Sequence, residues 1–230
     1  MDRRAFPAIL KITLVASAVL APAAAQTLTP ERTRYEGQLA FLLKNDRISL
    51  SVVEQGGALA DLHLISDPER LNPYWNPVRM ARELGQELDP KGTQGHFVCV
   101  DGFGPESAEE RAAGLPQHGE ARTLKWDVTG YLKNGKTAEL SFRTHLPVVQ
   151  ENFSRTLRLI DGENVIYVDS TLESELGFDR PVSWAEHFTL GSPFLAPVVT
   201  QTTISGTRAQ TRPYTGTGNA NAQRRLAGGC

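Results

Sequence analysis

Cysteine is scarce in this chain of 230 residues, which contains only two. Disulfide-stabilised scaffolds need a higher density, so these two residues make no disulfide framework. Cys99 lies in the apolar run of residues 96–100 and is predicted to be a buried free thiol. Cys230 is the last residue of the chain.

An excess of basic charge is also absent. The chain has 24 lysines and arginines against 26 aspartates and glutamates, and from residue 26 onward the acids outnumber the bases by 25 to 21. Nucleic acids and anionic membranes select for basic surfaces. We therefore expect neither a nucleic acid nor a membrane as a partner of the mature chain.

Short motifs for metals and common cofactors are missing as well. The five histidines show no HxH or HExxH spacing, and there is no CxxC pair, GxSxG motif or P-loop. We therefore expect no metal and no cofactor.

The most apolar stretch lies at the N-terminus. Three basic residues among the first eleven precede the apolar run of residues 12–20, and Ala23-Ala24-Ala25 forms a small-residue cleavage site. This order is typical of a secretory signal peptide, and the run is shorter than the roughly 18 apolar residues of a membrane span. We therefore expect residues 1–25 to be removed and the mature protein to be periplasmic or secreted.

Strand patterns fill most of the body of the chain, residues 26–205. The clearest lies at residues 138–146, where apolar residues alternate with polar and charged ones. Asn134-Gly135 and Asp161-Gly162 separate such runs and predict hairpin turns. Many short strands without alternating helices predict a mainly β fold, an antiparallel sandwich or barrel.

Three stretches depart from this pattern. Residues 78–88 predict a short helix, and residues 105–114 predict one or two helical turns with exposed charges. Residues 206–230 contain four arginines, no acid and almost no large apolar side chain. Such a segment cannot bury enough apolar surface to order itself. We expect it to be a tail outside the fold, either native, frame-shifted or vector-derived.

Two of the five histidines stand out as functional candidates. His118 is followed by a glycine and Glu120, and His187 follows Glu186, each with a tryptophan close in sequence. His63 and His145 are predicted to be ordinary surface or edge residues. His96 opens an apolar strand, where a structural role is favoured over a place in a pocket.

Carboxylates leave another possibility open. A glycosidase-type pair taken from Asp101, Glu120 and Glu186 is conceivable, because that chemistry uses two acids at a fixed separation. The separation does not follow from the sequence.

Six segments, in this order along the chain, resemble the galactose mutarotase-like (aldose 1-epimerase) superfamily. The resemblance covers roughly residues 45–195. The HG-x-AR-x-x-x-W pattern is most similar to the hexose-6-phosphate epimerase-like branch, although Glu120 stands where that branch usually has an aromatic residue. The segments are ISLSVVEQGGALADL (48–62), NPYWNP (72–77), GHFVCVDGFGP (95–105), LPQHGEARTLKW (115–126), FSRTLRLIDGENVIYVDSTLES (153–174) and WAEHFTLGSPF (184–194).

The resemblance implies a large antiparallel β-sandwich with a sugar cleft on one sheet, and an enzyme that interconverts the α and β anomers of an aldose. Ring opening needs a base for the C1 hydroxyl proton and an acid for the ring oxygen, and a histidine with a pKa of about 6.5 suits the second task. By resemblance His187 is the general acid, and His118 binds the sugar and polarises the C1 or ring oxygen. Arg122 would donate hydrogen bonds to hydroxyls or phosphate oxygens.

Three further residues are candidates for substrate binding. His96 can line a pocket, Glu186 is the carboxylate beside His187, and Trp184 can stack on a sugar face. Trp126 is predicted to be a buried core residue.

The chain departs from the family at one important place. The family's catalytic base is a glutamate near the C-terminus, preceded by a sugar-binding aspartate, but no acid follows Glu186 in this sequence. We therefore expect the sandwich to be incomplete at its C-terminus. Three functions stay open: an aldose 1-epimerase, a carbohydrate-binding β-sandwich module without the base, or a truncated product without function.

Overall fold

The computed structural model describes residues 29–89, 94–203 and 205. The predicted signal peptide and the predicted tail at 206–230 lie outside these residues, as does Cys230. Within the described residues, no helix is long and apolar enough to cross a bilayer.

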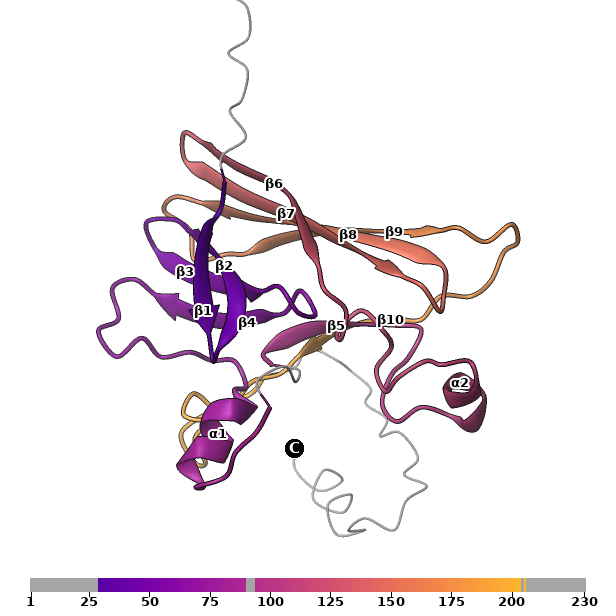
Figure 1. Ribbon diagram of the computed structural model, residues 1–230. Helices are drawn as coiled ribbons and strands as arrows, with labels where there is room; N and C mark the ends of the chain where they lie inside the picture. Colours follow the sequence, from indigo (N-terminus) through magenta and orange to yellow (C-terminus); the bar gives the residue numbers. More distant parts are fainter. Residues whose placement is uncertain (1–28, 90–93, 204, 206–230) are drawn as a thin grey trace, which may run out of the picture.

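Two antiparallel sheets make up the fold (Figure 1). One sheet has the strand order β1-β2-β3-β4-β5-β10, and the other has the order β6-β7-β8-β9. This arrangement confirms the prediction of a mainly β, antiparallel sandwich. The strands are β1 (Glu31–Tyr35), β2 (Gln38–Lys44), β3 (Ile48–Val53), β4 (Leu59–Leu64), β5 (His96–Val100), β6 (Asp127–Asn134), β7 (Thr137–Leu146), β8 (Glu151–Ile160), β9 (Tyr167–Ser174) and β10 (Trp184–Phe188).

The main core lies between the two sheets. Leu50 and Val100 from the six-stranded sheet pack with Leu140 and Phe153 from the four-stranded sheet, and all four are buried. Trp126, only 1% exposed, joins this core and donates its indole N–H to the Ala121 carbonyl at 2.9 Å. The side of each sheet that faces this core is called its inner face below, and the opposite side its outer face.

The outer face of the six-stranded sheet carries a smaller cluster of buried residues. Phe97 and Cys99 of β5 pack there with small residues of neighbouring strands. The prediction for Cys99 is confirmed, since it is a buried free thiol, and burial raises its pKa to about 11.

Several local predictions are confirmed. β7 shows the expected alternation of buried and less buried residues, and Gly135 and Gly162 have the positive φ of tight turns at the two predicted hairpins. Helix α1 (Pro77–Glu83) begins after Asn76, whose side chain accepts the Arg79 N–H. It is shorter than the predicted 78–88.

Helix α2 (Ala108–Ala112) lies within the predicted residues 105–114. Ser107 and Glu110 form a capping box at its start. Glu109 and Arg111 are exposed, as predicted for the charges of this segment.

The prediction for His63 is wrong. His63 lies on β4 and is 7% exposed, with Asp61 Oδ2 at 3.3 Å from its Nδ1. β4 is an interior strand of the six-stranded sheet, between β3 and β5, and the His63 side chain is therefore buried rather than at the surface or an edge. His145 has a half-exposed side chain, as expected.

Candidate functional site

The His118-Gly119 dipeptide forms a turn seated on the backbone of β5. Gly119 has φ +77°, and a Cβ at this position would lie 2.0 Å from the Val100 carbonyl oxygen. Only glycine permits this approach. His118 itself has φ +64°, a left-handed conformation that non-glycine residues adopt uncommonly and that often marks a functional position.

The His118 ring is fixed by a backbone donor. Its Nδ1 accepts the N–H of Gly104 at 3.2 Å, and Cys99 Sγ lies 3.5 Å from the same nitrogen. Because a backbone N–H can only donate, Nδ1 is unprotonated and the neutral ring carries its proton on Nε2. Burial, together with the nearby His187 and Arg122, lowers the pKa of His118.

His187 lies next to His118 on the outer face. It pairs with Phe97 across β10 and β5, and its ring stacks on the Phe97 ring with centroids 4.3 Å apart. Thr189 Oγ1 lies 2.8 Å from His187 Nδ1. The centroids of the two imidazoles are 5.1 Å apart.

Both histidines line one cavity of about 430 Å³, which we call the two-histidine pocket. Arg122 also lines it, with its Nε donating to the Gln117 carbonyl at 2.7 Å, and burial lowers the pKa of its guanidinium. Three of the residues expected from the sequence therefore meet in one place. The lining residues are Trp75, Pro77, Leu88, Asp89, Phe97, Gln117, His118, Arg122, His187 and Thr189.

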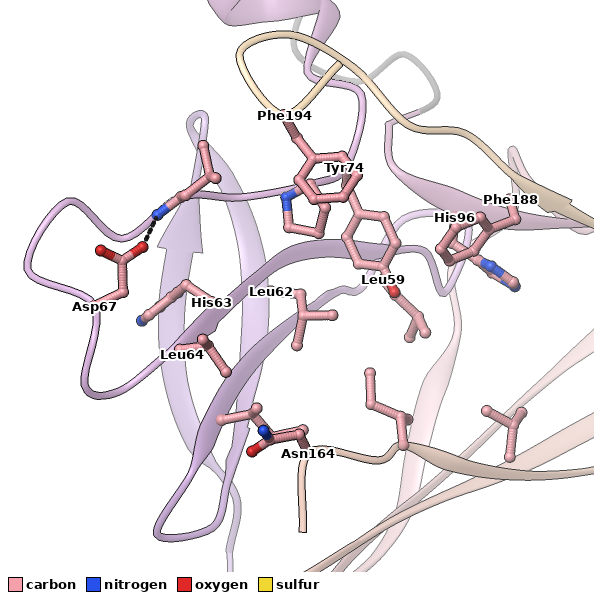
Figure 2. A pocket seen from close by; sticks show the side chains of 15 residues that line it. Leu59, Leu62, His63, Leu64, Asp67, Tyr74, His96, Asn164, Phe188 and Phe194 are labelled. Atoms are coloured by element: carbon pink, nitrogen blue, oxygen red, sulfur yellow. Dashed lines mark hydrogen bonds between the residues drawn. The ribbon is translucent and has the colours of Figure 1, made fainter. Parts of the chain in front are cut away.

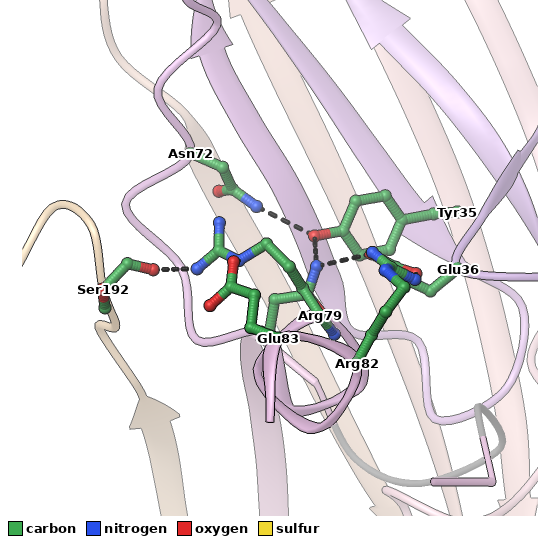
Figure 3. A network of polar contacts seen from close by, with 8 residues as sticks. Tyr35, Glu36, Asn72, Arg79, Arg82, Glu83 and Ser192 are labelled. Carbon is green, nitrogen blue, oxygen red and sulfur yellow. Dashed lines mark hydrogen bonds and ion pairs between the residues drawn. The ribbon is translucent and has the colours of Figure 1, made fainter. Parts of the chain in front are cut away.

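A polar network holds the segment that carries Trp75 and Pro77. The Asn76 side chain donates to the Tyr35 hydroxyl at 2.8 Å and to Glu36 at 2.9 Å, and Arg82 of α1 pairs with Glu36 at 2.9 Å (Figure 3). Burial raises the pKa of Tyr35 to about 12, so this hydroxyl stays protonated. The network ties α1 to the β1–β2 turn and so fixes one wall of the two-histidine pocket.

The other three expected residues lie on the inner face instead. Trp184 and Glu186 of β10 pair with Val100 and Val98 of β5, both of which belong to the core between the sheets, and His96 lies on the same face of β5 as Val98. His96 Nε2 lies 2.6 Å from Glu186 Oε2, and Glu186 is 3.1 Å from Arg155 Nη2. Neighbouring residues of a strand point to opposite faces, so Glu186 cannot share a ligand with His187.

Glu186 and Arg155 perturb one another. Burial acts to raise the pKa of Glu186, but the hydrogen bond from His96 and the charge of Arg155 outweigh it, so the pKa is lowered. Burial lowers the pKa of Arg155, and Glu186 opposes that shift. This cluster is an ion pair between the sheets.

The remaining carboxylates considered from the sequence are engaged elsewhere. Glu120 is buried and accepts the backbone N–H groups of Val148 and Val149. Asp101 pairs with Arg180 at 2.5 Å and accepts the Ser183 N–H. The three acids therefore do not form a catalytic pair around the two histidines.

Seven of the ten residues that line the two-histidine pocket were not singled out as site residues from the sequence, Trp75 and Asp89 among them. Trp75 lies in the NPYWNP segment, and the place of this segment in the order of family-like motifs was the only sign of a functional role. Asp89 is a single acid in a loop, and no sequence pattern around it indicates a function. Alternation within β10 was a usable signal for the separation of Glu186 from His187. Among the described residues, no three His, Cys, Asp or Glu side chains converge as a metal site.

Comparison with known proteins gives fold-level matches alone. No protein-family model matches the chain, and no curated protein matches it. One similar solved structure is described as a putative mutarotase (YeaD) from Salmonella typhimurium, with a TM-score of 0.42 and 16% identity, covering 60% of this chain and 47% of that one. Another is HI1317, with a TM-score of 0.40 and 19% identity, covering 60% and 51%. The chain spans about half the length of each, and neither match carries an argument about activity.

Proposed function

We propose that the two-histidine pocket binds an aldose and interconverts its anomers in the manner of an aldose 1-epimerase. The observation that supports this most is that the His118 and His187 rings lie 5.1 Å apart in one cavity that also contains a carboxylate, Asp89. Its volume of about 430 Å³ falls within the ~300–1,000 Å³ range of small-molecule sites.

Each group has a distinct task in this proposal. Asp89 accepts the proton of the C1 hydroxyl while the bond from C1 to the ring oxygen breaks, and His187 donates a proton to that oxygen. His118 stays neutral and donates a hydrogen bond from Nε2. Arg122 donates to sugar hydroxyls, and Trp75 offers an aromatic face for stacking. Reclosure on the other face of C1 reverses both proton transfers and gives the second anomer.

We also propose that the substrate is an unphosphorylated aldose, since the N-terminal sequence is typical of an exported protein and phosphosugars are not expected outside the cytoplasm. N-terminal sequencing of the mature protein from culture checks the export step. A chain that still begins at Met1 would contradict it.

The test of catalysis is polarimetry, or NMR of the anomeric protons, on freshly dissolved α-D-glucose and α-D-galactose. The purified chain should accelerate mutarotation over the spontaneous rate, and His187→Gln should lower that acceleration by about 10²–10⁴-fold, the usual contribution of a positioned acid or base. Asp89→Asn should lower it similarly, whereas His145→Gln, on a half-exposed histidine of β7, should leave it unchanged. Sugar binding without any acceleration would instead identify a non-catalytic binding module.

A further inference from the structure

Within the described part of the chain, the sandwich is open along one side. β9 is the last strand of the four-stranded sheet and β10 is the last strand of the six-stranded sheet, and no described strand pairs with the free edge of either one. The two edges line the same opening, because Phe153 and Arg155 of β8, the neighbour of β9, contact Trp184 and Glu186 of β10.

Inner-face side chains are exposed at this opening. Val168 of β9 pairs with the fully buried Leu157, yet it is 39% exposed. On β10, Trp184 and Phe188 are 42% and 57% exposed, although the inner-face residues of β5 beside them are largely covered. Part of the apolar layer between the sheets is therefore exposed to solvent at β9 and β10.

An apolar cavity of about 490 Å³ lies behind this opening. Figure 2 shows His96 and Phe188 at one end and His63 and Asp67 at the other, with Tyr74 projecting between them. Val168 also lines it, so the cavity reaches both open strands. Apolar surface of this kind favours a partner that covers it.

The segment of β9 and the turn after it is acidic. Residues 167–179 contain four acids and no lysine or arginine, and the next basic residue, Arg180, is already paired with Asp101 and Glu151. Asp169 and Glu173 are exposed on the outer face of β9, and they make no hydrogen bond or ion pair with any described residue. An occupant of this edge would therefore gain from positive charge on its outer face.

We propose that an extended polypeptide segment with alternating apolar and basic residues adds to the free edge of β9 as a fifth strand. Its backbone would pair with β9, as in other cases of strand addition. Its apolar side chains would cover Val168 and the exposed aromatic rings of β10, and its lysines or arginines would face Asp169 and Glu173. This period of two matches the alternation of β9 itself.

A second copy of the chain fits the edge less well. Pairing β9 with its own copy in antiparallel fashion places the outward acids of both copies on one face, where like charges repel. Exposed edges commonly carry charges that oppose self-pairing in this way. The acids thus favour a basic partner over self-association.

The test uses a fluorescent nine-residue peptide of alternating lysine and valine. Binding is followed by fluorescence anisotropy, and hydrogen exchange of the β9 amides is measured with and without the peptide. We expect saturable binding and slower exchange in β9. A glutamate–valine peptide of the same length should bind at least about tenfold more weakly, and a lysine–valine peptide with a central proline should not protect β9, because proline cannot pair as a strand residue.

Two double variants of the protein test whether binding depends on the charges of β9. Asp169→Asn combined with Glu173→Gln should weaken binding of the lysine–valine peptide by about three- to tenfold. The matched control, Glu87→Gln with Glu109→Gln, removes the same amount of charge from exposed positions that do not line this cavity. It should leave the dissociation constant of the peptide unchanged. Equal binding of both charged peptides, or binding without protection of β9, would overturn the proposal. So would a stable dimer whose β9 amides are protected without peptide.

Discussion

The imidazole rings of His118 and His187 meet edge to face, with centroids 5.1 Å apart and an angle of 86° between their planes. They are 69 positions apart in the chain, and two tertiary features bring them together. One is the pairing of β5 with β10, and the other is the close packing of Gly119 against the backbone of Val100.

The variant Gly119→Ala tests this close contact between Gly119 and Val100. A methyl group there would meet the Val100 carbonyl oxygen, and the positive φ is unfavourable for alanine. We expect a loss of about 3 kcal/mol or more in the free energy of unfolding, measured by urea denaturation. Gly135→Ala is the control, since its turn has a similar φ but open space, and it should cost about 1 kcal/mol. Equal losses in the two variants would contradict the close contact.

The lowered pKa of His118 predicts a pH dependence of stability. Between the folded pKa and the unfolded value of about 6.5, the unfolded state binds the proton and the folded state does not. Stability should therefore fall as the pH drops below about 6.5 and level off below the folded pKa. The difference between wild type and His118→Gln, measured by urea denaturation from pH 8 to 5, isolates this effect. Parallel curves would show that His118 does not contribute it.

Removal of the Glu186 charge should destabilise the fold without affecting the sugar site. Glu186→Gln leaves the buried guanidinium of Arg155 without its counter-charge, and we expect a loss of about 3 kcal/mol in the free energy of unfolding. Glu31→Gln removes an exposed ion pair with Lys44 and should cost under about 1 kcal/mol.

The same variant checks the separation of the two faces. Its sugar dissociation constant, measured by titration calorimetry, should equal that of wild type. A weakened sugar affinity in a folded Glu186→Gln variant would show that the inner face contributes to the site after all.

Trp126 should be a stability residue. Trp126→Phe leaves a cavity in the core and removes the donor to the Ala121 carbonyl, for an expected loss of about 2–4 kcal/mol in thermal or urea unfolding. Trp184→Phe, on the partly exposed β10, should cost about 1 kcal/mol or less. If the Trp126 variant lost sugar binding while keeping full stability, the core assignment would be wrong.

Local structure was largely predictable from sequence. The alternation that gave β7 and the glycine turns at residues 135 and 162 depend on neighbours in the chain, and each was found where expected. The outcome for His63 differed because its burial depends on β4 lying between β3 and β5, and strand order is a long-range property.

The sequence by itself determined the strand-rich character, the hairpin turns and the candidate histidines, because backbone conformation and side-chain alternation are local. Only the tertiary structure decided that His118, His187 and Arg122 share one pocket while His96, Trp184 and Glu186 face the core. That division depends on which strands pair and in which register. A shift of one residue in β10 would exchange its two faces, and packing of the whole sandwich selects between them.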